Sequence, residues 1–297
     1  MACLSPLKAV RDSSGVRIVG PYAFFSNLLL PCGKCKACLA ERSRQWAVRC
    51  MHEASLYDNN CFVTLTYNDD HLPSDGSLNH VHFQRFFKRL RKHYFGRRIR
   101  YYMAGEYGSK LGRPHYHAII FNLDFADKRL WRKTQAGSIL YRSDTLETLW
   151  PFGFSSVGDV TFESAAYVAR YCLKKVTGDA AFSHYKTVDL STGEVTHLLP
   201  EYNKMSLKPG IAADWYAQFS SDVHNHDYVV TRDGKTCRPP RYYDKLLKRA
   251  DPDAFEFIKD MREAKLLELS DDNTPQRLQA KAVIIDQNLS KLKRTLE

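Results

Sequence analysis

The sequence lacks the features that mark a membrane-bound or exported protein. No apolar run approaches the length of a membrane-spanning helix, and the mean hydropathy is −0.44. Residues 1–11 lack the charged-then-apolar layout of an export signal. No internal repeat or low-complexity block is present. We therefore expect a soluble, intracellular protein with no membrane partner.

A Walker-type phosphate loop, GxxxxGK[ST], is also absent, so any unwinding of DNA would need a separate helicase. Basic charge is what the chain has in excess, since 44 Lys+Arg against 33 Asp+Glu give the 297 residues a formal charge of +11. Such an excess favours a polyanionic partner such as nucleic acid, although many soluble proteins are also basic. The 17 Tyr and 16 Phe are enough for a core and for exposed rings that stack on bases.

The apolar pattern predicts strands that alternate with helices. Residues 61–67 are β-branched and aromatic between polar clusters, which is typical of a strand, and Asn79 is a good N-cap for a helix reaching residue 94. Further strands are predicted at 99–106, 115–123 and 152–160, and further helices at 36–57 and 164–176. Residues 1–30 are expected to be irregular, and a charged helical tail is expected from residue 251. This order indicates an α+β fold with an antiparallel sheet covered by helices.

Two histidines in one predicted strand form a candidate metal site. His115 and His117 are two residues apart, so both side chains point to the same face. The HxH pattern alone is weak because it occurs often by chance. A hairpin turn at 108–113 would place Glu106 opposite His115 or its neighbour, where cross-strand Cβ atoms lie about 5 Å apart. A carboxylate with two imidazoles suits Mn²⁺ or Mg²⁺, although Glu106 could instead pair with Arg113.

Two tyrosines in the predicted helix 164–176 form a second candidate site. Tyr167 and Tyr171 are four residues apart and project from one helix face, in the company of Arg170, Lys174 and Lys175. A phenol is a poor nucleophile at its reference pKa of about 10, but nearby cations and a metal-bound phosphate favour the phenolate. Two aromatic residues at this spacing are, by themselves, more often part of a core.

Taken together, the motifs resemble a known family. The segments 62–66 (FVTLT), 114–117 (PHYH) and 167–174 (YVARYCLK) occur in the order of the three rolling-circle replication motifs. The chain resembles the replication initiators of the Microviridae, most closely those of the gokushovirus type, within the HUH endonuclease superfamily. The resemblance covers most of residues 1–245, including WPFGF at 150–154 and PPRYY at 239–243. It implies a Rep-type core with a central antiparallel sheet, ferredoxin- or RRM-like.

The composition along the chain and the resemblance together predict a domain organisation. We expect a Cys-rich N-terminal segment and helix at 1–58, an HUH endonuclease core at 59–180, an accessory segment that packs on this core at 181–250, and the helical tail at 251–297.

The activity that the resemblance implies is the nicking of single-stranded DNA at the phage origin. His115, His117 and Glu106 would hold a divalent cation, Mg²⁺ or Mn²⁺. One tyrosine would attack the scissile phosphate, leaving a 5′-phosphotyrosine link and a free 3′-OH, and the second would act at termination, when the strand is rejoined. Lys174 would stabilise the developing charge. An alternative has Tyr171 as the sole nucleophile and Tyr167 as a structural residue.

Partners and location follow from the same resemblance. We expect origin DNA, the host replicative helicase and the host polymerase as partners, in the cytoplasm of the host bacterium. Cationic residues expected to contact DNA lie on the two predicted helices: Arg85, Lys88, Arg89, Lys92, Arg170 and Lys175. An ordinary solvated basic face is an equally simple explanation for the first four. Alternative functions are an HUH transposase or relaxase, and a non-catalytic binding protein for single-stranded DNA.

The first predicted motif holds two threonines that alternate with apolar residues. Val63 and Leu65 are expected to face helices, which leaves the hydroxyls of Thr64 and Thr66 near the site or bound DNA. Threonine is also simply a good strand former.

A cysteine cluster precedes the first predicted helix. Cys32, Cys35 and Cys38 are spaced CxxCxxC, and Cys3 could supply a fourth thiolate for a structural zinc ion. Gly33 suits the tight turn of such a knuckle. An iron–sulfur cluster and a set of unligated thiols are the alternatives.

Overall fold

The computed structural model describes residues 3–108, 111–134, 137–176, 178–188, 192–231, 234–268 and 270–291, without the side chains of 171–174, 267 and 270. Contacts between residues divide the chain into two compact units. One unit joins residues 3–45 to 241–291, and the other comprises the described residues of 46–240. The helix α1 (Lys36–Ala54) begins in the first unit and ends in the second.

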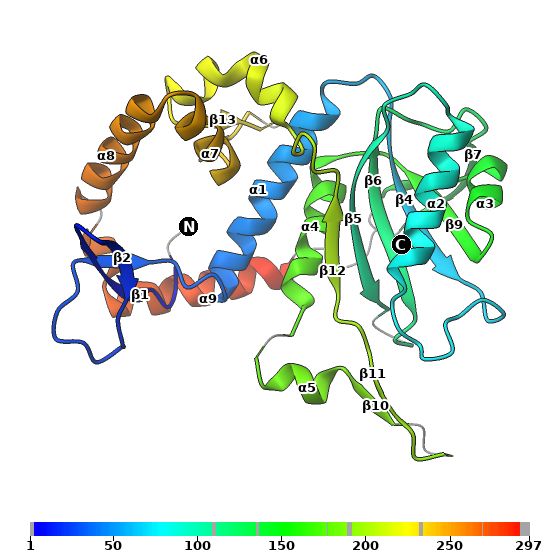
Figure 1. Cartoon of the computed structure of the whole chain (residues 1–297), viewed down its shortest axis with the longest axis horizontal. Helices are drawn as coiled ribbons and strands as arrows, with labels where there is room; N and C mark the ends of the chain where they lie inside the picture. The colour runs from blue at the N-terminus through cyan, green and yellow to red at the C-terminus, as the bar shows by residue number, and fades with distance from the viewer. Residues whose placement is uncertain are drawn as a thin grey trace. The chain divides into compact units, whose positions relative to one another are not determined.

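The second unit is built on a seven-stranded antiparallel sheet with the order β12-β5-β6-β4-β9-β8-β7 (Figure 1). Its strands are β4 (Asn60–Tyr67), β5 (Arg100–Tyr107), β6 (Pro114–Phe121), β7 (Arg129–Lys133), β8 (Ile139–Arg142), β9 (Gly153–Gly158) and β12 (Tyr202–Met205). The helices that contact it are the C-terminal part of α1, α2 (His80–His93), α3 (Asp144–Leu149) and α4 (Phe162–Lys174). The predicted α+β fold with an antiparallel sheet is confirmed.

The inner part of this unit has a ferredoxin-like arrangement. In chain order it reads β4, α2, β5, β6, α3, β9, and the four strands lie side by side as β5-β6-β4-β9. Strands β7 and β8 lie beyond β9, and β12 pairs with β5 at the other edge. The first two motifs expected from the sequence, 62–66 and 114–117, therefore fall on the central strands β4 and β6 and not on edges, and the third lies on α4.

One face of the sheet is covered by α2 and α3 (Figure 1). Asn79 caps α2 by accepting a hydrogen bond from the Val81 amide at 3.1 Å, as the sequence predicts. The buried residues of α2 follow helical spacing and pack on Val63 and Leu65 of β4; they are Phe83, Phe86, Phe87 and Leu90. The prediction that Val63 and Leu65 face helices is confirmed.

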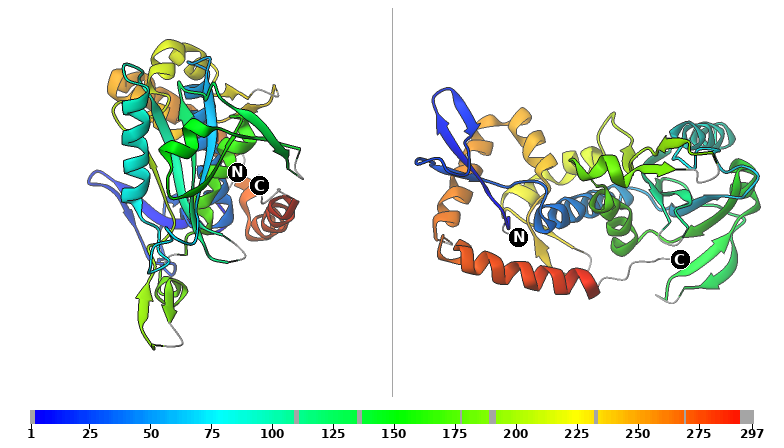
Figure 2. Two further views of the ribbon diagram at one scale, coloured as in Figure 1. Left: turned by 90° about the vertical axis from the view of Figure 1, so that its right-hand side faces the viewer. Right: turned by 90° about the horizontal axis from the view of Figure 1, so that it is seen from below.

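The opposite face packs against α4 and the C-terminal part of α1 (Figure 2). Phe62 and Ile119 alternate along their strands with the residues that face α2, so they belong to this second cluster with Ala47, Cys50 and Val168. Thr161 and Ser164 cap the start of α4 reciprocally, each backbone amide donating to the other side chain.

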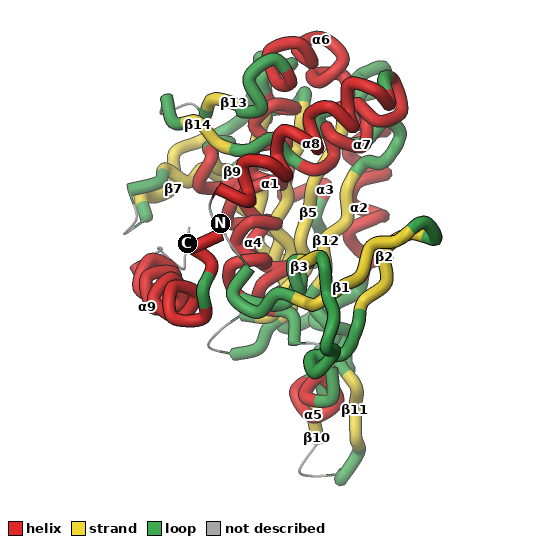
Figure 3. Tube along the Cα trace, turned by 90° about the vertical axis from the view of Figure 1, so that its left-hand side faces the viewer, coloured by secondary structure: helices red, strands yellow, loops and turns green. Residues whose placement is uncertain are grey.

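The first unit contains a small three-stranded sheet and the C-terminal helices (Figure 3). The order β2-β1-β3 is formed by β1 (Leu7–Asp12), β2 (Gly15–Ile18) and β3 (Leu28–Leu30). The expectation that residues 1–30 are irregular is therefore wrong. Strand β2 has only four residues, all exposed, and the alternation of Val16 and Ile18 with Arg17 is too short to identify a strand.

The predicted charged tail is helical. The C-terminal helices are α7 (Arg241–Ala250), α8 (Pro252–Glu268), η1 (Ser270–Asn273) and α9 (Pro275–Lys291). Arg262 of α8 pairs with Asp244 of α7 at 3.0 Å. None of the described helices combines the length and apolar character needed to cross a membrane.

The remaining elements follow α4 in the chain. They are α5 (Ala180–His184), β10 (Lys186–Val188), β11 (Val195–His197), α6 (Ala213–His224), β13 (Val229–Val230) and β14 (Thr236–Cys237). Strands β10 and β11 form one hairpin, and β13 and β14 form another.

Gly153 permits β9 to enter the sheet beside β4. Its φ of +150° is rarely adopted by residues with a side chain. A Cβ there would lie 2.2 Å from the Asn68 amide nitrogen and 2.5 Å from the Thr66 carbonyl oxygen. Both are backbone atoms, of β4 and of the residue that follows it, so they cannot rotate away as a flexible side chain could. The glycine of the 150–154 segment is thus required by close approach of two backbones.

We expect Gly153→Ala to lower the free energy of unfolding by about 2–4 kcal/mol, since it adds overpacking to backbone strain. Gly158→Ala, in the same strand, is the matched control, because its Cβ would lie 3.5 Å from the nearest atom, a flexible Leu140 methyl. Its effect should stay within about 1 kcal/mol. Urea denaturation of both variants measures the difference, and equal effects would contradict this account of Gly153.

Candidate metal site and tyrosine helix

Strand register brings a carboxylate and two imidazoles to one face of the sheet. Strand β6 runs between β5 and β4, with Glu106 of β5 opposite His115 and Thr64 of β4 opposite His117. The hairpin geometry predicted from the sequence is confirmed in this register. All three candidate ligands share the face that α4 covers, because they alternate with residues packed against α2.

The ligand atoms of the three residues converge on one point. His115 Nε2 lies 2.7 Å from Glu106 Oε1, and His117 Nε2 lies 2.9 Å from the same oxygen. The two imidazole rings are nearly perpendicular, with centroids 4.9 Å apart. Glu106 and His117 are buried, and only about a tenth of the His115 side chain is exposed. We call Glu106, His115 and His117 the Glu-His-His cluster.

Each imidazole is oriented through its other nitrogen. His115 Nδ1 donates to the Arg113 carbonyl oxygen at 3.1 Å, which leaves Nε2 directed at Glu106. His117 Nδ1 lies 3.0 Å from the Thr64 hydroxyl. Histidines that bind metals are commonly held by such a second hydrogen bond, which fixes the ring and its tautomer. The hydroxyl of Thr64 therefore lies at the Glu-His-His cluster, as the sequence predicts.

The electrostatics of the cluster favour an ionised carboxylate. Burial opposes ionisation of Glu106, but the hydrogen bonds and charges of His115 and His117 outweigh it and lower the pKa of Glu106 to about 2. Arg113 does not pair with Glu106, the alternative left open by the sequence. It forms an ion pair with Asp69 and donates a hydrogen bond to the Tyr67 carbonyl oxygen.

The donor set fits a divalent cation. The three ligand atoms lie within 4.8 Å of one another, on adjacent strands of a rigid sheet. Ligands about 2.1 Å from one ion lie about 3–3.5 Å from each other, so small movements of these side chains would accommodate it. One carboxylate and two imidazoles leave further positions for water or a phosphate oxygen.

The helix α4 brings Tyr167 against the Glu-His-His cluster. The ring of Tyr167 meets that of His117 edge-on, with centroids 5.2 Å apart, and only 6 % of the residue is exposed. The Arg170 guanidinium lies 5.8 Å from the centre of the Tyr167 ring. Tyr167 therefore adjoins the cluster and also belongs to the core. Tyr171 and Lys174 follow on the same helix, but their side chains lie outside the described part of the chain.

The cationic residues expected to contact DNA are divided between the two faces of the sheet. Arg85, Lys88 and Lys92 are exposed on α2, which covers the face away from the cluster. Arg89 is half-buried and donates from Nε to the Leu149 carbonyl at 2.9 Å, which ties α2 to α3. Arg170 and the exposed Lys175 accompany α4 and lie on the side of the cluster. The structure does not bring the α2 residues to the cluster, and their binding to DNA stays a prediction.

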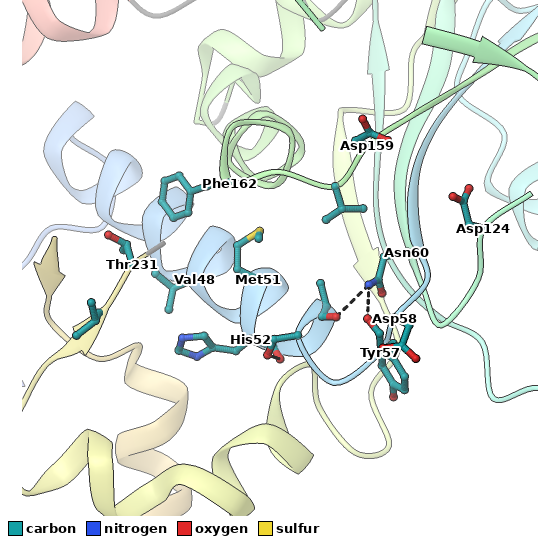
Figure 4. Close-up of a pocket in the computed structure, with 14 residues that line it drawn as sticks. Val48, Met51, His52, Tyr57, Asp58, Asn60, Asp124, Asp159, Phe162 and Thr231 are labelled. Atoms are coloured by element: carbon teal, nitrogen blue, oxygen red, sulfur yellow. Dashed lines mark hydrogen bonds between the residues drawn. The ribbon is translucent and has the colours of Figure 1, made fainter. Parts of the chain in front are cut away.

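A pocket lies at the start of β4, at Asn60, away from the Glu-His-His cluster (Figure 4). It has a volume of about 590 Å³ and is lined by residues of α1, the start of α4 and three carboxylates, Asp58, Asp124 and Asp159. Asn60 at its wall donates to the carbonyls of Ala54 and Tyr57. Three carboxylates make a poor surface for phosphate groups, so the cluster, not this pocket, is the candidate site for nucleic acid.

The chain is similar to proteins of known viruses. A sequence model of the family of ORF2-type replication-associated proteins matches residues 60–176. The replication-associated protein VP4 of Bdellovibrio phage phiMH2K is 33% identical over 263 residues, 85% of this chain and 79% of that protein. The replication-associated protein ORF2 of Spiroplasma virus 4 is 34% identical over 290 residues, 89% and 86% of the two chains.

The replication-associated protein ORF4 of Chlamydia phage 1 is 39% identical over 236 residues, 77% of this chain and 56% of that protein. No solved structure matches the chain. The matched family segment begins with β4 and ends just after α4, so it contains the Glu-His-His cluster and both candidate tyrosines. As its motifs predict, the chain belongs to the family of replication-associated proteins of Microviridae-type phages.

Proposed function

We propose that this replication-associated protein is a rolling-circle initiator that nicks single-stranded origin DNA through tyrosine attack and rejoins the strand at termination. The observation that carries the proposal is the convergence of Glu106, His115 and His117 beside Tyr167 of α4. A transposase or relaxase would use the same residue types, but the relatives that span most of this chain are replication-associated proteins.

In the proposed reaction a tyrosine oxygen attacks the scissile phosphorus. A phosphorus–oxygen bond to the tyrosine forms, the bond from phosphorus to the 3′ oxygen breaks, and the phenolic proton passes to solvent while the 3′ oxygen gains one. The products are a 5′-phosphotyrosine link and a 3′-OH that primes synthesis. Rejoining is the reverse exchange, in which a 3′-OH attacks the phosphotyrosine, so no external energy source is needed.

The proposed reaction assigns a separate role to each residue of the site. Glu106, His115 and His117 would hold Mg²⁺ or Mn²⁺, which when bound neutralises charge on the phosphate and makes it more electrophilic. Thr64 and the Arg113 carbonyl orient the two imidazoles. Arg170 supplies positive charge beside Tyr167 on α4, and Lys174 is proposed to stabilise the phenolate.

The proposal extends to the cellular context. The +11 charge suits a DNA substrate, and unwinding and synthesis are assigned to the host helicase and polymerase in the bacterial cytoplasm. We also propose that residues 59–180 form the endonuclease core and 181–250 an accessory segment.

Incubating the cognate phage's single-stranded genome with the protein and Mn²⁺ should give a covalent protein–DNA adduct that survives SDS electrophoresis. Replacing both tyrosines, Tyr167→Phe with Tyr171→Phe, should lower its yield by about 1,000-fold or more, because the nucleophile is lost. Tyr22→Phe, at a residue 92 % exposed in the other unit, should leave the yield unchanged.

The single variants Tyr167→Phe and Tyr171→Phe separate the two mechanisms when the linked peptide is mapped by mass spectrometry. The two-tyrosine mechanism predicts that each variant still forms an adduct, at its remaining tyrosine. The one-tyrosine mechanism predicts an adduct only at Tyr171. An adduct that persists in the double variant would refute tyrosine chemistry on α4. Tight binding of the strand by wild-type protein without any adduct would favour a non-catalytic binding protein instead.

Mn²⁺ titration followed by calorimetry tests the metal assignment. Glu106→Gln should abolish measurable binding, because the negative charge is lost and a neutral amide oxygen is a much weaker ligand than a carboxylate. Thr64→Val keeps the shape of the side chain but removes the hydrogen bond to His117, and should weaken Mn²⁺ binding about 10–100-fold. The controls are Glu163→Gln on α4 and Thr187→Val on β10, both exposed residues. Unchanged affinity in Glu106→Gln would remove the cluster as the binding site.

A further inference from the structure

The proposed function makes no use of a second group of potential ligands, in the first unit. Cys3 lies before β1, Cys32 and Cys35 lie in the turn that follows β3, and Cys38 lies in the first turn of α1. Their four Sγ atoms lie within 4.8 Å of one another, although 29 residues separate Cys3 from Cys32 along the chain. We call Cys3, Cys32, Cys35 and Cys38 the four-cysteine cluster.

From this geometry we infer that the four-cysteine cluster is a structural zinc site. Zinc takes four thiolates in a tetrahedron with Zn–S distances of about 2.3 Å, which places neighbouring sulfurs about 3.8 Å apart. The Sγ atoms of Cys3 and Cys35 are separated by 3.8 Å. A disulfide would bring the two sulfurs to about 2.05 Å, so the cluster is spaced for a central ion and not for a covalent pair.

The backbone around the four-cysteine cluster supports bound thiolates. The amide of Cys32 donates to Cys3 Sγ at 3.2 Å, and the amide of Cys35 donates to Cys32 Sγ at 3.3 Å. Hydrogen bonds to an ionised acceptor are stronger than those to a neutral one, so these amides favour the thiolate form that zinc requires. Gly33, with φ of +73°, forms the turn that lets Cys32 and Cys35 point to one centre.

The surrounding structure explains why the three-stranded sheet needs additional stabilisation. In the three-stranded sheet only Ala9 and Val10 of β1 are buried, and every residue of β2 is exposed. A sheet with so little buried apolar surface is not stable by itself. A zinc ion shared by Cys3 and the 32–38 segment would close the chain around this sheet and hold it to the start of α1. Four protein ligands leave no open position, so the role is structural and not catalytic.

Zinc content of the full-length protein tests the inference. Wild-type protein purified in reductant should retain about one zinc ion per chain. Cys35→Ser should retain almost none, and Cys237→Ser, at another part-buried cysteine but in the second unit, should retain the wild-type amount. A variant lacking both histidines, His115→Ala with His117→Ala, should also keep it, which separates this zinc from any ion at the Glu-His-His cluster.

A measurement on the wild-type chain keeps the inference testable if Cys35→Ser fails to fold. Zinc-edge X-ray absorption should show four sulfur neighbours at about 2.3 Å and no nitrogen neighbour. Removing the zinc with a strong chelator should expose four additional thiols to a thiol-specific reagent. Absence of zinc, nitrogen neighbours in its shell, or the visible absorption of an iron–sulfur cluster would each overturn the inference.

Discussion

Glu106 meets the two histidines only because β5 and β6 pair with Glu106 opposite His115. Side chains alternate between the faces of a strand, so a slip of one residue in β5 would turn Glu106 toward α2 and bring Gly105 or Tyr107 opposite His115. The same condition applies to β4, where Thr64 reaches His117 only when the two residues are directly opposed. One antiparallel register thus fixes the ligands and the group that orients them.

The apolar side of the sheet is what maintains this register. Val63 and Leu65 alternate with Thr64 and are buried against α2, so any slip that disrupted the cluster would also expose core residues. Gly153 lets β9 approach β4 closely enough to complete the sheet beside it. The positions of the ligand-bearing strands therefore depend on packing on the other face, while the hydrogen bonds of Thr64 and the Arg113 carbonyl orient the two imidazole rings.

The elements that could be predicted from the sequence are those with a strong local pattern. The helix α2 follows from apolar spacing and the Asn79 cap, and the β5–β6 hairpin follows from its turn, so Glu106 could be placed beside His115. Strand β12, with the sequence YNKM, has no alternation and is defined only by pairing with β5. The contact between Thr64 and His117 joins residues 53 positions apart, and short-range patterns do not specify such pairings. The hydrogen bond from His115 to the Arg113 carbonyl could not be predicted either, because every residue has a backbone carbonyl.

The proposed reaction places its ligands and its nucleophiles on different kinds of element. Glu106, His115 and His117 stand on strands with hydrogen-bonded neighbours on both sides, whereas Tyr167 stands on a helix that packs on the sheet largely through side chains. Positions four apart on a helix are separated by about 6 Å along its axis and lie on one face, so Tyr167 and Tyr171 are both available to one phosphate in the proposed reaction. Packed helices tolerate small sliding movements that a strand ladder resists. In the proposed two-tyrosine reaction, a small shift of α4 would present one tyrosine and then the other, while the phosphate stays against ligands that do not move.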